Sequence, residues 1–426
     1  MLRRPLLRTR HLIVVAILLF LVFRISVYPP HLSYSWLPLR GIWTTNSAAV
    51  LATNATLGFG RIYVVSKEDS PRRPGLLQAA NVTELDLTIP IQPTWTKDDL
   101  EGHKGIGRGS MLAWLGHLHS LRQYVSFSSS LPDAEPQLTH HHHPPFRFVD
   151  SGAETALFFE DDVDWDIRLR SLQAPLVATA VRTLLAPKPD PTSFPKSDAH
   201  RNPRLDVRHY PYGDPTAWDL LYLGHCGDYW HGVSEGFEKG HVNPEDLAAR
   251  PHISFNDSSL PDPSNLHPWT ASLLESLGVP PRTRLVHASV FPLCTFAYAV
   301  TRDAAQRMLK QLSLEARADD GPVAYDVAIL HRCRADDGIR CWTVNPELFH
   351  HMPGKSMIGG IDNHSNIPPV DATGREQAEE RKETPNIDCG FWSGAFTFQP
   401  SDKGRLDRLR REVGRKGRCL KAGSKL

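Results

Sequence analysis

The sequence predicts an α/β domain built on a single, largely parallel, Rossmann-like sheet that is flanked by helices and interrupted by long loops. Short β-branched and aromatic runs, such as residues 61–66 and 219–226, are typical of buried strands. They alternate with amphipathic stretches such as 110–125, whose apolar residues repeat at helical spacing. Proline- and glycine-rich segments separate these units. Strands that alternate with helices favour a parallel sheet.

The first half of the chain provides two strands, each followed by a polar segment and a helix. The strand at 61–66 ends in a charged loop, 67–74, which is where an open α/β sheet binds its ligand. A glycine-rich stretch then leads to the helix at 110–125, with Ser110 as the expected N-cap. The following units are a Ser-, Pro- and His-rich loop, a strand with an acidic end, and a helix, expected at 126–148, 157–164 and 167–185.

The second half is expected to complete the sheet. A proline-rich insertion at 186–215 precedes the 219–226 strand, and weakly periodic loops follow at 227–285. The later elements are a strand at 296–300, a helix through 314 capped by Thr301 or Asp303, a helix from 326 and a strand at 341–344.

The strand at 157–159 ends in four carboxylates within five positions, from Glu160 to Asp164. Carboxylates are rarely buried unless they are paired or bind a metal, so this turn suggests a divalent cation site. Asp is also a favoured helix N-cap, and the turn could equally begin a solvated helix. The residues alone leave both interpretations open.

Bulk composition excludes one class of partner. The chain has 426 residues, 41% of them hydrophobic, which is enough for a sizeable core. Its formal net charge of +1 provides no field to attract nucleic acid. We therefore expect no nucleic-acid partner.

The N-terminus predicts a membrane anchor. Four arginines in the first ten residues precede twelve uninterrupted apolar residues at 12–23, which keeps the N-terminus cytosolic. We expect a cytosolic tail at 1–10, an uncleaved signal anchor forming a transmembrane helix at 11–28 and a stem at 29–58. The apolar core is short, so a cleaved signal peptide is the alternative, although no small-residue cleavage site follows it.

Cysteines and glycosylation sequons agree with a lumenal chain. The six cysteines are even in number and lack the spacing of a metal site. Cys333 and Cys341 are eight residues apart and could close a short loop, whereas the other pairings stay open. Sequons occur at four asparagines: Asn54, Asn81, Asn256 and Asn363.

Several landmarks, in order, resemble glycosyltransferase family 25, the lipopolysaccharide and procollagen galactosyltransferases. The strand at 62–65 with its basic loop is similar to the family's opening "IYVINL…R", and 109–122 to its "GxxGCxLSHxxxxR" helix. Residues 159–162 match its acidic "EDD" motif. Residues 218–224, 297–305 and 346–349 resemble its "WDlvyLG", "aYvvsrxgAxkLL" and "xPxLfxq" segments.

The chain also departs from the family pattern. Leu112, Ala113 and Gly116 replace the second Gly, the Cys and the Ser of the helix motif, while His117 matches its His. The closing "SDI" is not intact at 356–358, and the long inserts leave the acceptor undefined.

The resemblance implies a GT-A fold over residues 59–370, a C-terminal extension at 371–426, and a UDP-sugar donor, with UDP-galactose expected. It further implies transfer with inversion and assistance from Mn²⁺. Asp162, Asp164 and His351 are the expected metal ligands, with Glu160 and His350 as alternatives. A separate carboxylate should take the acceptor proton: Asp326, Asp336 or Asp337. The expected donor-binding residues are Val65, Ser66, Arg72, Gly109, His117, Glu160 and Asp161.

Under this interpretation the protein is a single-pass type II protein of the Golgi or endoplasmic reticulum membrane. Its partners would be a nucleotide sugar and a glycan or glycoprotein acceptor. Two alternatives stay open: a lumenal glycoside hydrolase, which also needs paired carboxylates, and a non-catalytic carbohydrate-binding protein of the same fold.

Overall fold

The computed structural model describes residues 54–100, 103–129, 154–186, 207, 209–228, 230, 242–334, 338–352 and 381–421. The expected anchor at 11–28, most of the stem, the 130–148 part of the histidine-rich loop, Asp336, Asp337 and Asn363 lie outside these residues. Among the helices that are described, none combines the length and the apolar character needed to cross a membrane.

In the described residues, ten strands form an eight-stranded sheet and a separate two-stranded sheet. The strand order of the large sheet is β2-β1-β3-β8-β5-β9-β7-β6, and β4 pairs with β10. The strands are β1 (Arg61–Val65), β2 (Leu87–Thr88), β3 (Thr155–Glu160), β4 (Val163–Trp165), β5 (Leu220–Gly224), β6 (His252–Asn256), β7 (Thr283–Ala288), β8 (Ala297–Thr301), β9 (Cys341–Asn345) and β10 (Phe349–His351).

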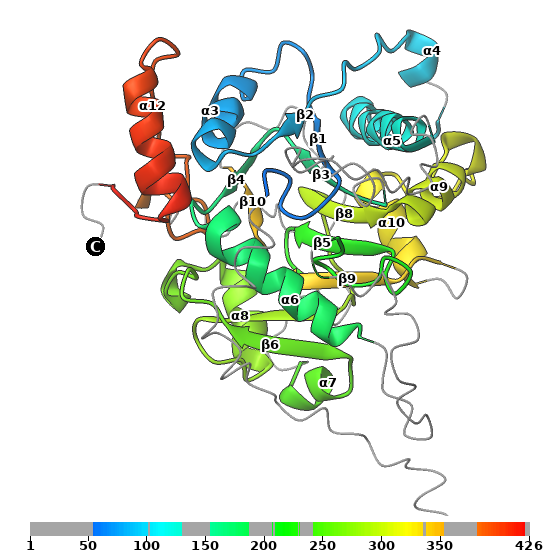
Figure 1. Cartoon of the computed structure of the whole chain (residues 1–426). Helices are drawn as coiled ribbons and strands as arrows, with labels where there is room; N and C mark the ends of the chain where they lie inside the picture. The colour runs from blue at the N-terminus through cyan, green and yellow to red at the C-terminus, as the bar shows by residue number, and fades with distance from the viewer. Residues whose placement is uncertain are drawn as a thin grey trace, which may run out of the picture.

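The helices surround this sheet (Figure 1). The α-helices are α3 (Arg73–Thr83), α4 (Lys97–Leu100), α5 (Arg108–Ser129), α6 (Ala174–Leu184), α7 (Pro244–Ala248), α8 (Pro268–Ser276), α9 (Arg302–Gln311), α10 (Tyr325–Arg334) and α12 (Lys403–Leu409). Short 3₁₀ and π turns occur at η1 (Leu169–Gln173), η4 (Pro263–Asn265), η5 (Leu314–Ala316) and η6 (Arg410–Arg415).

The α/β class and the mostly parallel sheet are confirmed. β1, β2 and β3 are parallel, as are β5 and β9, whereas β8 and β7 run antiparallel to both of their neighbours. Six strands therefore share one direction and two oppose it, so the sheet is mixed. One expectation was wrong: the segment at 227–285 is not only loop, because it contains α7, β6 and α8.

Both faces of the large sheet are buried, because successive side chains of the central strands point alternately to one face and the other. Ile62 and Val64 of β1 pack in the cluster that includes α3 and α6. Tyr63 of β1 and Phe158 of β3 point to the opposite face, where α5, α9 and α10 pack. A sheet covered on both faces needs strands that are apolar at every position, which is why β1 and β3 could be recognised in the sequence.

Helix ends show where local sequence signals succeed and fail. Thr301 caps α9, since its hydroxyl accepts from the backbone N–H of Ala304 at 3.3 Å. Ser110 is not an N-cap, because α5 begins at Arg108 and Ser110 lies inside the first turn. The glycines on either side of Arg108 obscured this earlier helix start in the sequence.

Three disulfides join all six cysteines: Cys226–Cys294, Cys333–Cys341 and Cys389–Cys419. The short Cys333–Cys341 loop is therefore confirmed. Disulfides are typical of lumenal or secreted proteins.

The C-terminal segment, residues 381–421, packs against the rest of the described structure. α12 and η6 lie against α3, with the red helix beside the blue one in Figure 1. Val82 of α3 and Ile167 share an apolar cluster with Phe396, Leu409 and Val413. Residues of the C-terminal segment thus share a buried apolar cluster with α3.

One glycine sets how closely this segment approaches α3. A Cβ atom at Gly414 would lie 2.1 Å from the carbonyl oxygen of Val82. We expect Gly414→Ala to lower the free energy of unfolding by about 2 kcal/mol, because backbone must move to relieve the overlap. Chemical unfolding followed by fluorescence measures this. Gly404→Ala in α12 is the matched control: its nearest neighbour is 3.8 Å away, and alanine favours the helix. Equal stability of the two variants would contradict the prediction.

Candidate functional site

The candidate site lies where β1 and β3 end. These strands are parallel neighbours, so Ser66 and Glu160 emerge at the same edge of the sheet. β8 runs the opposite way and begins at this edge, where the backbone N–H of Glu160 donates to the carbonyl of Phe296 at 3.0 Å. The acidic turn, residues 160–162, connects β3 to β4 and is thus at the carboxyl end of the central strands.

Asp162 is held by two basic side chains. The Arg72 guanidinium donates to Asp162 Oδ2 at 2.6 Å, and His351 Nε2 lies 2.9 Å from the same oxygen. Burial would raise the pKa of Asp162, but the hydrogen bond from His351 and the positive charges of His351 and Arg72 outweigh it and hold the pKa below its usual range. Asp162 therefore stays ionised.

The second oxygen of Asp162 is different. Asp162 Oδ1 is buried and has no hydrogen-bond partner among the described residues. An unsatisfied buried carboxylate oxygen is costly and requires an explanation, for which an ion or a ligand group is a standard reason.

Ser66 connects the acidic turn to α3. Its hydroxyl donates to Asp161 Oδ2 at 2.5 Å. Arg73 in turn donates through Nε to Ser66 Oγ and through a terminal nitrogen to the Ser66 carbonyl, both at 3.1 Å. Two adjacent arginines, Arg72 and Arg73, thus line the mouth of β1 beside two carboxylates.

Glu160 ends a chain of buried polar groups. His117 Nε2 lies 3.3 Å from Glu160 Oε1, and His117 Nδ1 lies 3.1 Å from the hydroxyl of Tyr298. The Tyr298 and Tyr325 hydroxyls are 3.1 Å apart. If His117 donates to the carboxylate, its other nitrogen accepts from Tyr298, which accepts from Tyr325. Burial, with the negative charge of Asp162, raises the pKa of Glu160 despite the hydrogen bond from His117.

Asp326 is the second residue of α10, and the charge of His117 acts to lower its pKa. Its two oxygens accept from the backbone N–H groups of Cys294, at 3.1 Å, and Val327, at 2.9 Å. Burial raises its pKa, and the two backbone hydrogen bonds offset part of this effect.

Asp164 is turned away from the other acidic residues. It is 1% exposed, and its carboxylate accepts from the Thr384 hydroxyl and from the backbone of Phe391 and Trp392. Asp164, an expected metal ligand, therefore accepts hydrogen bonds from the C-terminal segment instead. His350 also points elsewhere, to Glu347.

The structure thus brings together seven of the expected residues and separates others. Ser66, Arg72, His117, His351 and the turn residues Glu160, Asp161 and Asp162 contact one another in pairs. Val65 ends β1 next to Ser66, while Gly109 lies in the first turn of α5. Within the described ranges, no three His, Cys, Asp or Glu side chains converge as a ready-made metal site.

Neither protein-family models nor curated proteins match this sequence.

Four further residues of the site were not anticipated: Arg73, Thr295, Tyr298 and Tyr325. The Thr295 hydroxyl lies 3.4 Å from Glu160 Oε1, and Tyr325 stacks on His117 with ring centroids 4.6 Å apart. Only Arg73 carried a sequence signal, since it neighbours Arg72 in the basic loop. The tyrosines resemble core residues in an apolar strand and at a helix start, and only the fold reveals their hydroxyl contacts.

Proposed function

We propose that this protein is a glycosyltransferase that transfers a hexose, with galactose the first choice, from a UDP-sugar to a glycan or glycoprotein acceptor. The proposal includes a GT-A-like fold, inversion at the sugar carbon and assistance from Mn²⁺, as the resemblance to family 25 implies. The observation that carries it is the pairing of Arg72 and His351 with Asp162 at the carboxyl end of β3. Open α/β sheets bind nucleotides at this end of their strands.

The residues present fit a divalent cation that is bound mainly by its substrate. Asp162 Oδ1 is a buried, unpartnered oxygen, which is the hard ligand that such cations prefer. Asp162 and His351 would hold the cation, and the diphosphate and water would complete its shell, because a ready-made three-ligand cage is not present in the described part of the chain. When bound, the cation would offset the charge of the departing diphosphate.

The arginines serve the same leaving group. Arg72 is mostly buried, and a guanidinium binds phosphate oxygens through two parallel donors. Arg73 fixes Ser66 and therefore the end of β1. The diphosphate side of the site would then be the side of Asp162 and Arg72.

The proton acceptor should lie on the other side of the sugar. Glu160 shares its turn with Asp162, whereas Asp326 comes from α10, a different element. We therefore retain Asp326 as the proposed base and assign Glu160 to a sugar hydroxyl. Burial raises the pKa of Asp326, which makes its carboxylate a better base near neutral pH.

The three disulfides and the sequence signals support a lumenal address, and we propose a type II protein of the Golgi or endoplasmic reticulum membrane. The anchor is the expected membrane contact.

Thermal unfolding of the full chain with nucleotide sugars tests the proposal. We expect UDP-sugars with Mn²⁺ to raise the unfolding midpoint, because a ligand present at 100 times its dissociation constant stabilises the folded state by about 2.7 kcal/mol. ADP- and GDP-sugars at the same concentration are the controls. If no UDP-sugar raises the midpoint and none is consumed with any acceptor, the proposal is wrong; hydrolysis of glycosides without nucleotide would instead indicate a hydrolase.

A further inference from the structure

The two-stranded sheet of β4 and β10 positions two residues of the candidate site, because His351 lies in β10 and Asp162 immediately precedes β4. His351 pairs with Val163, and His350 with Asp164, in an antiparallel register. The backbone N–H of Met352 donates to the carbonyl of Asp162 at 2.8 Å. The positions of Asp162 and His351 therefore depend on where this small sheet lies.

The C-terminal segment holds the β4 strand through Asp164. Asp164 Oδ2 accepts from Thr384 Oγ1 at 2.8 Å and from the Trp392 N–H at 3.3 Å, while Oδ1 accepts from the Phe391 N–H at 2.8 Å. A Cβ atom at Gly390 would lie 2.2 Å from Oδ2, so only glycine allows this approach. A buried carboxylate with this many donors is fixed in one orientation.

The same segment holds the β10 side through Asn386. Its amide nitrogen donates to Glu347 Oε1 at 2.7 Å, and that oxygen also contacts His350. The side-chain oxygen Oδ1 of Asn386 accepts from the His267 backbone N–H at 2.7 Å. Thr384 and Asn386, two residues apart, thus reach both strands that support Asp162 and His351.

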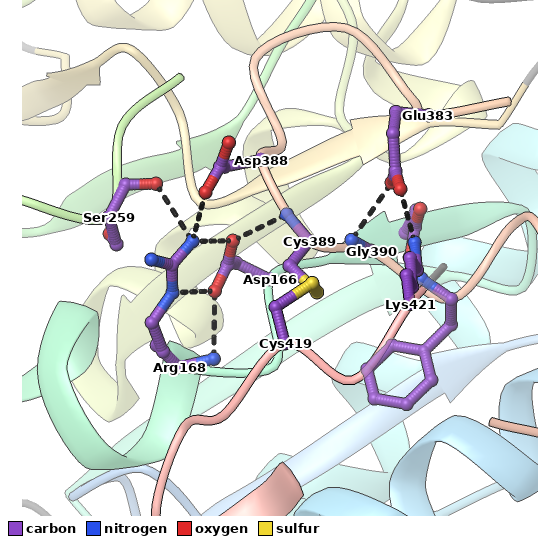
Figure 2. The surroundings of a disulfide bond; sticks show 11 residues. Asp166, Arg168, Ser259, Glu383, Asp388, Cys389, Gly390, Cys419 and Lys421 are labelled. Atoms are coloured by element: carbon purple, nitrogen blue, oxygen red, sulfur yellow. Dashed lines mark hydrogen bonds and ion pairs between the residues drawn. A yellow bond between two sulfur atoms is a disulfide. The ribbon is translucent and has the colours of Figure 1, made fainter. Parts of the chain in front are cut away.

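The segment is itself locked to the domain, as Figure 2 shows. Cys389 and Cys419 form a disulfide, and Cys389 donates through its N–H to Asp166 at 2.9 Å. Arg168 pairs with both Asp166 and Asp388, at 2.7 and 2.8 Å. Lys421 pairs with Glu383 near the end of the described chain. Thr384 and Asn386 therefore have little freedom to move.

We propose that Thr384 and Asn386 are positioning residues that hold the acidic turn and His351 in the geometry that binds the nucleotide sugar and its cation. This inference rests on the proposed function. Both residues act through other side chains and would not contact the donor. Groups that orient the ligands of a metal typically change its affinity or the activity by 10- to 100-fold when they are replaced.

The test compares Thr384→Val with Thr384→Ser in the full chain. Valine keeps the shape and removes the hydroxyl, whereas serine keeps the hydroxyl. We expect Thr384→Val to weaken calorimetric binding of UDP with Mn²⁺ by about tenfold and to raise KM for the UDP-sugar, with a smaller change in kcat. Thr384→Ser should restore both. Asn386→Ala, which releases the β10 side, should weaken binding in the same direction.

Asp402→Ala is the control for a purely structural effect. Asp402 lies in the same segment, is exposed, and caps α12 by accepting from the Arg405 N–H at 2.9 Å. It should lower the unfolding midpoint and leave UDP binding unchanged. Wild-type affinity in folded Thr384→Val overturns the inference, as does wild-type affinity in Asn386→Ala if the valine variant does not fold. If the wild-type chain itself binds no UDP with Mn²⁺, the proposed function fails, and this inference fails with it.

Discussion

Asp162→Asn is expected to reduce sugar transfer by at least about 100-fold, because replacing a group that only orients a metal ligand already costs up to about that much. The amide keeps the size of the side chain but removes its negative charge. In the wild type, Arg72 and His351 both contact Asp162 Oδ2, at 2.6 and 2.9 Å. The amide also removes the hard anionic ligand at Oδ1, which is buried and without a partner among the described residues. A neutral amide oxygen is a much weaker ligand for a divalent cation than a carboxylate.

Initial rates of UDP release from a UDP-sugar, at saturating Mn²⁺, measure this loss. The unfolding midpoint of the variant shows whether it is folded. Asp69→Asn is the matched control, because Asp69 follows the neighbouring parallel strand β1 but is exposed and pairs with the exposed Lys67. Exposed pairs contribute little, so this variant should keep its rate. A folded Asp162→Asn protein with a rate within a few-fold of wild type would remove Asp162 from the proposed chemistry.

Much of the sheet could be predicted because its central strands are apolar on both faces. β1, β3, β5, β8 and β9 all fall within one or two residues of the stretches expected from the sequence. β6 and β7 were missed, since they mix polar and apolar residues near the edge of the sheet, as His252 and Asn256 illustrate. Edge strands lack the continuous apolar signal of central ones.

The site could be predicted only in part, and Asp162 and Asp164 show why. Both belong to one acidic cluster, and nothing local distinguishes them. Asp164 differs from the other acidic residues because it accepts a hydrogen bond from Thr384, which is 220 residues away in the sequence. Asp162 contacts His351, which is 189 residues away in the sequence. Contacts of this range depend on the whole fold, so the type of residue was predictable while its partner was not.

Arg284→Met is expected to lower the free energy of unfolding by about 3–5 kcal/mol, the range for removing one member of a buried ion pair. Arg284 and Asp257 are both 0% exposed, and Arg284 Nε donates to Asp257 Oδ2 at 2.7 Å. Methionine has a similar length but leaves the charge of Asp257 buried without compensation. The Pro346 and Glu347 carbonyls would also lose the donor that they share. Chemical unfolding measures the loss, with the exposed Lys67→Met as the control.

The pH dependence of this loss distinguishes an uncompensated charge from a packing defect. Burial would raise the pKa of Asp257, but the charge of Arg284 and the hydrogen bonds from Ser259 outweigh it and lower the pKa. In the wild type, the contribution of Asp257 is therefore present above its unfolded pKa of about 3.9 and is lost as the pH falls through the lower folded value. In Arg284→Met, burial raises the pKa of Asp257 with no charge from Arg284 to oppose it. The pKa of Asp257 in the folded variant then lies above its unfolded value, so protonation of Asp257 stabilises the variant. The stability difference between the two proteins should consequently narrow as the pH falls from 7 toward about 4. A difference that is constant over this range would mean that lost packing, not the unpaired charge, destabilises the variant.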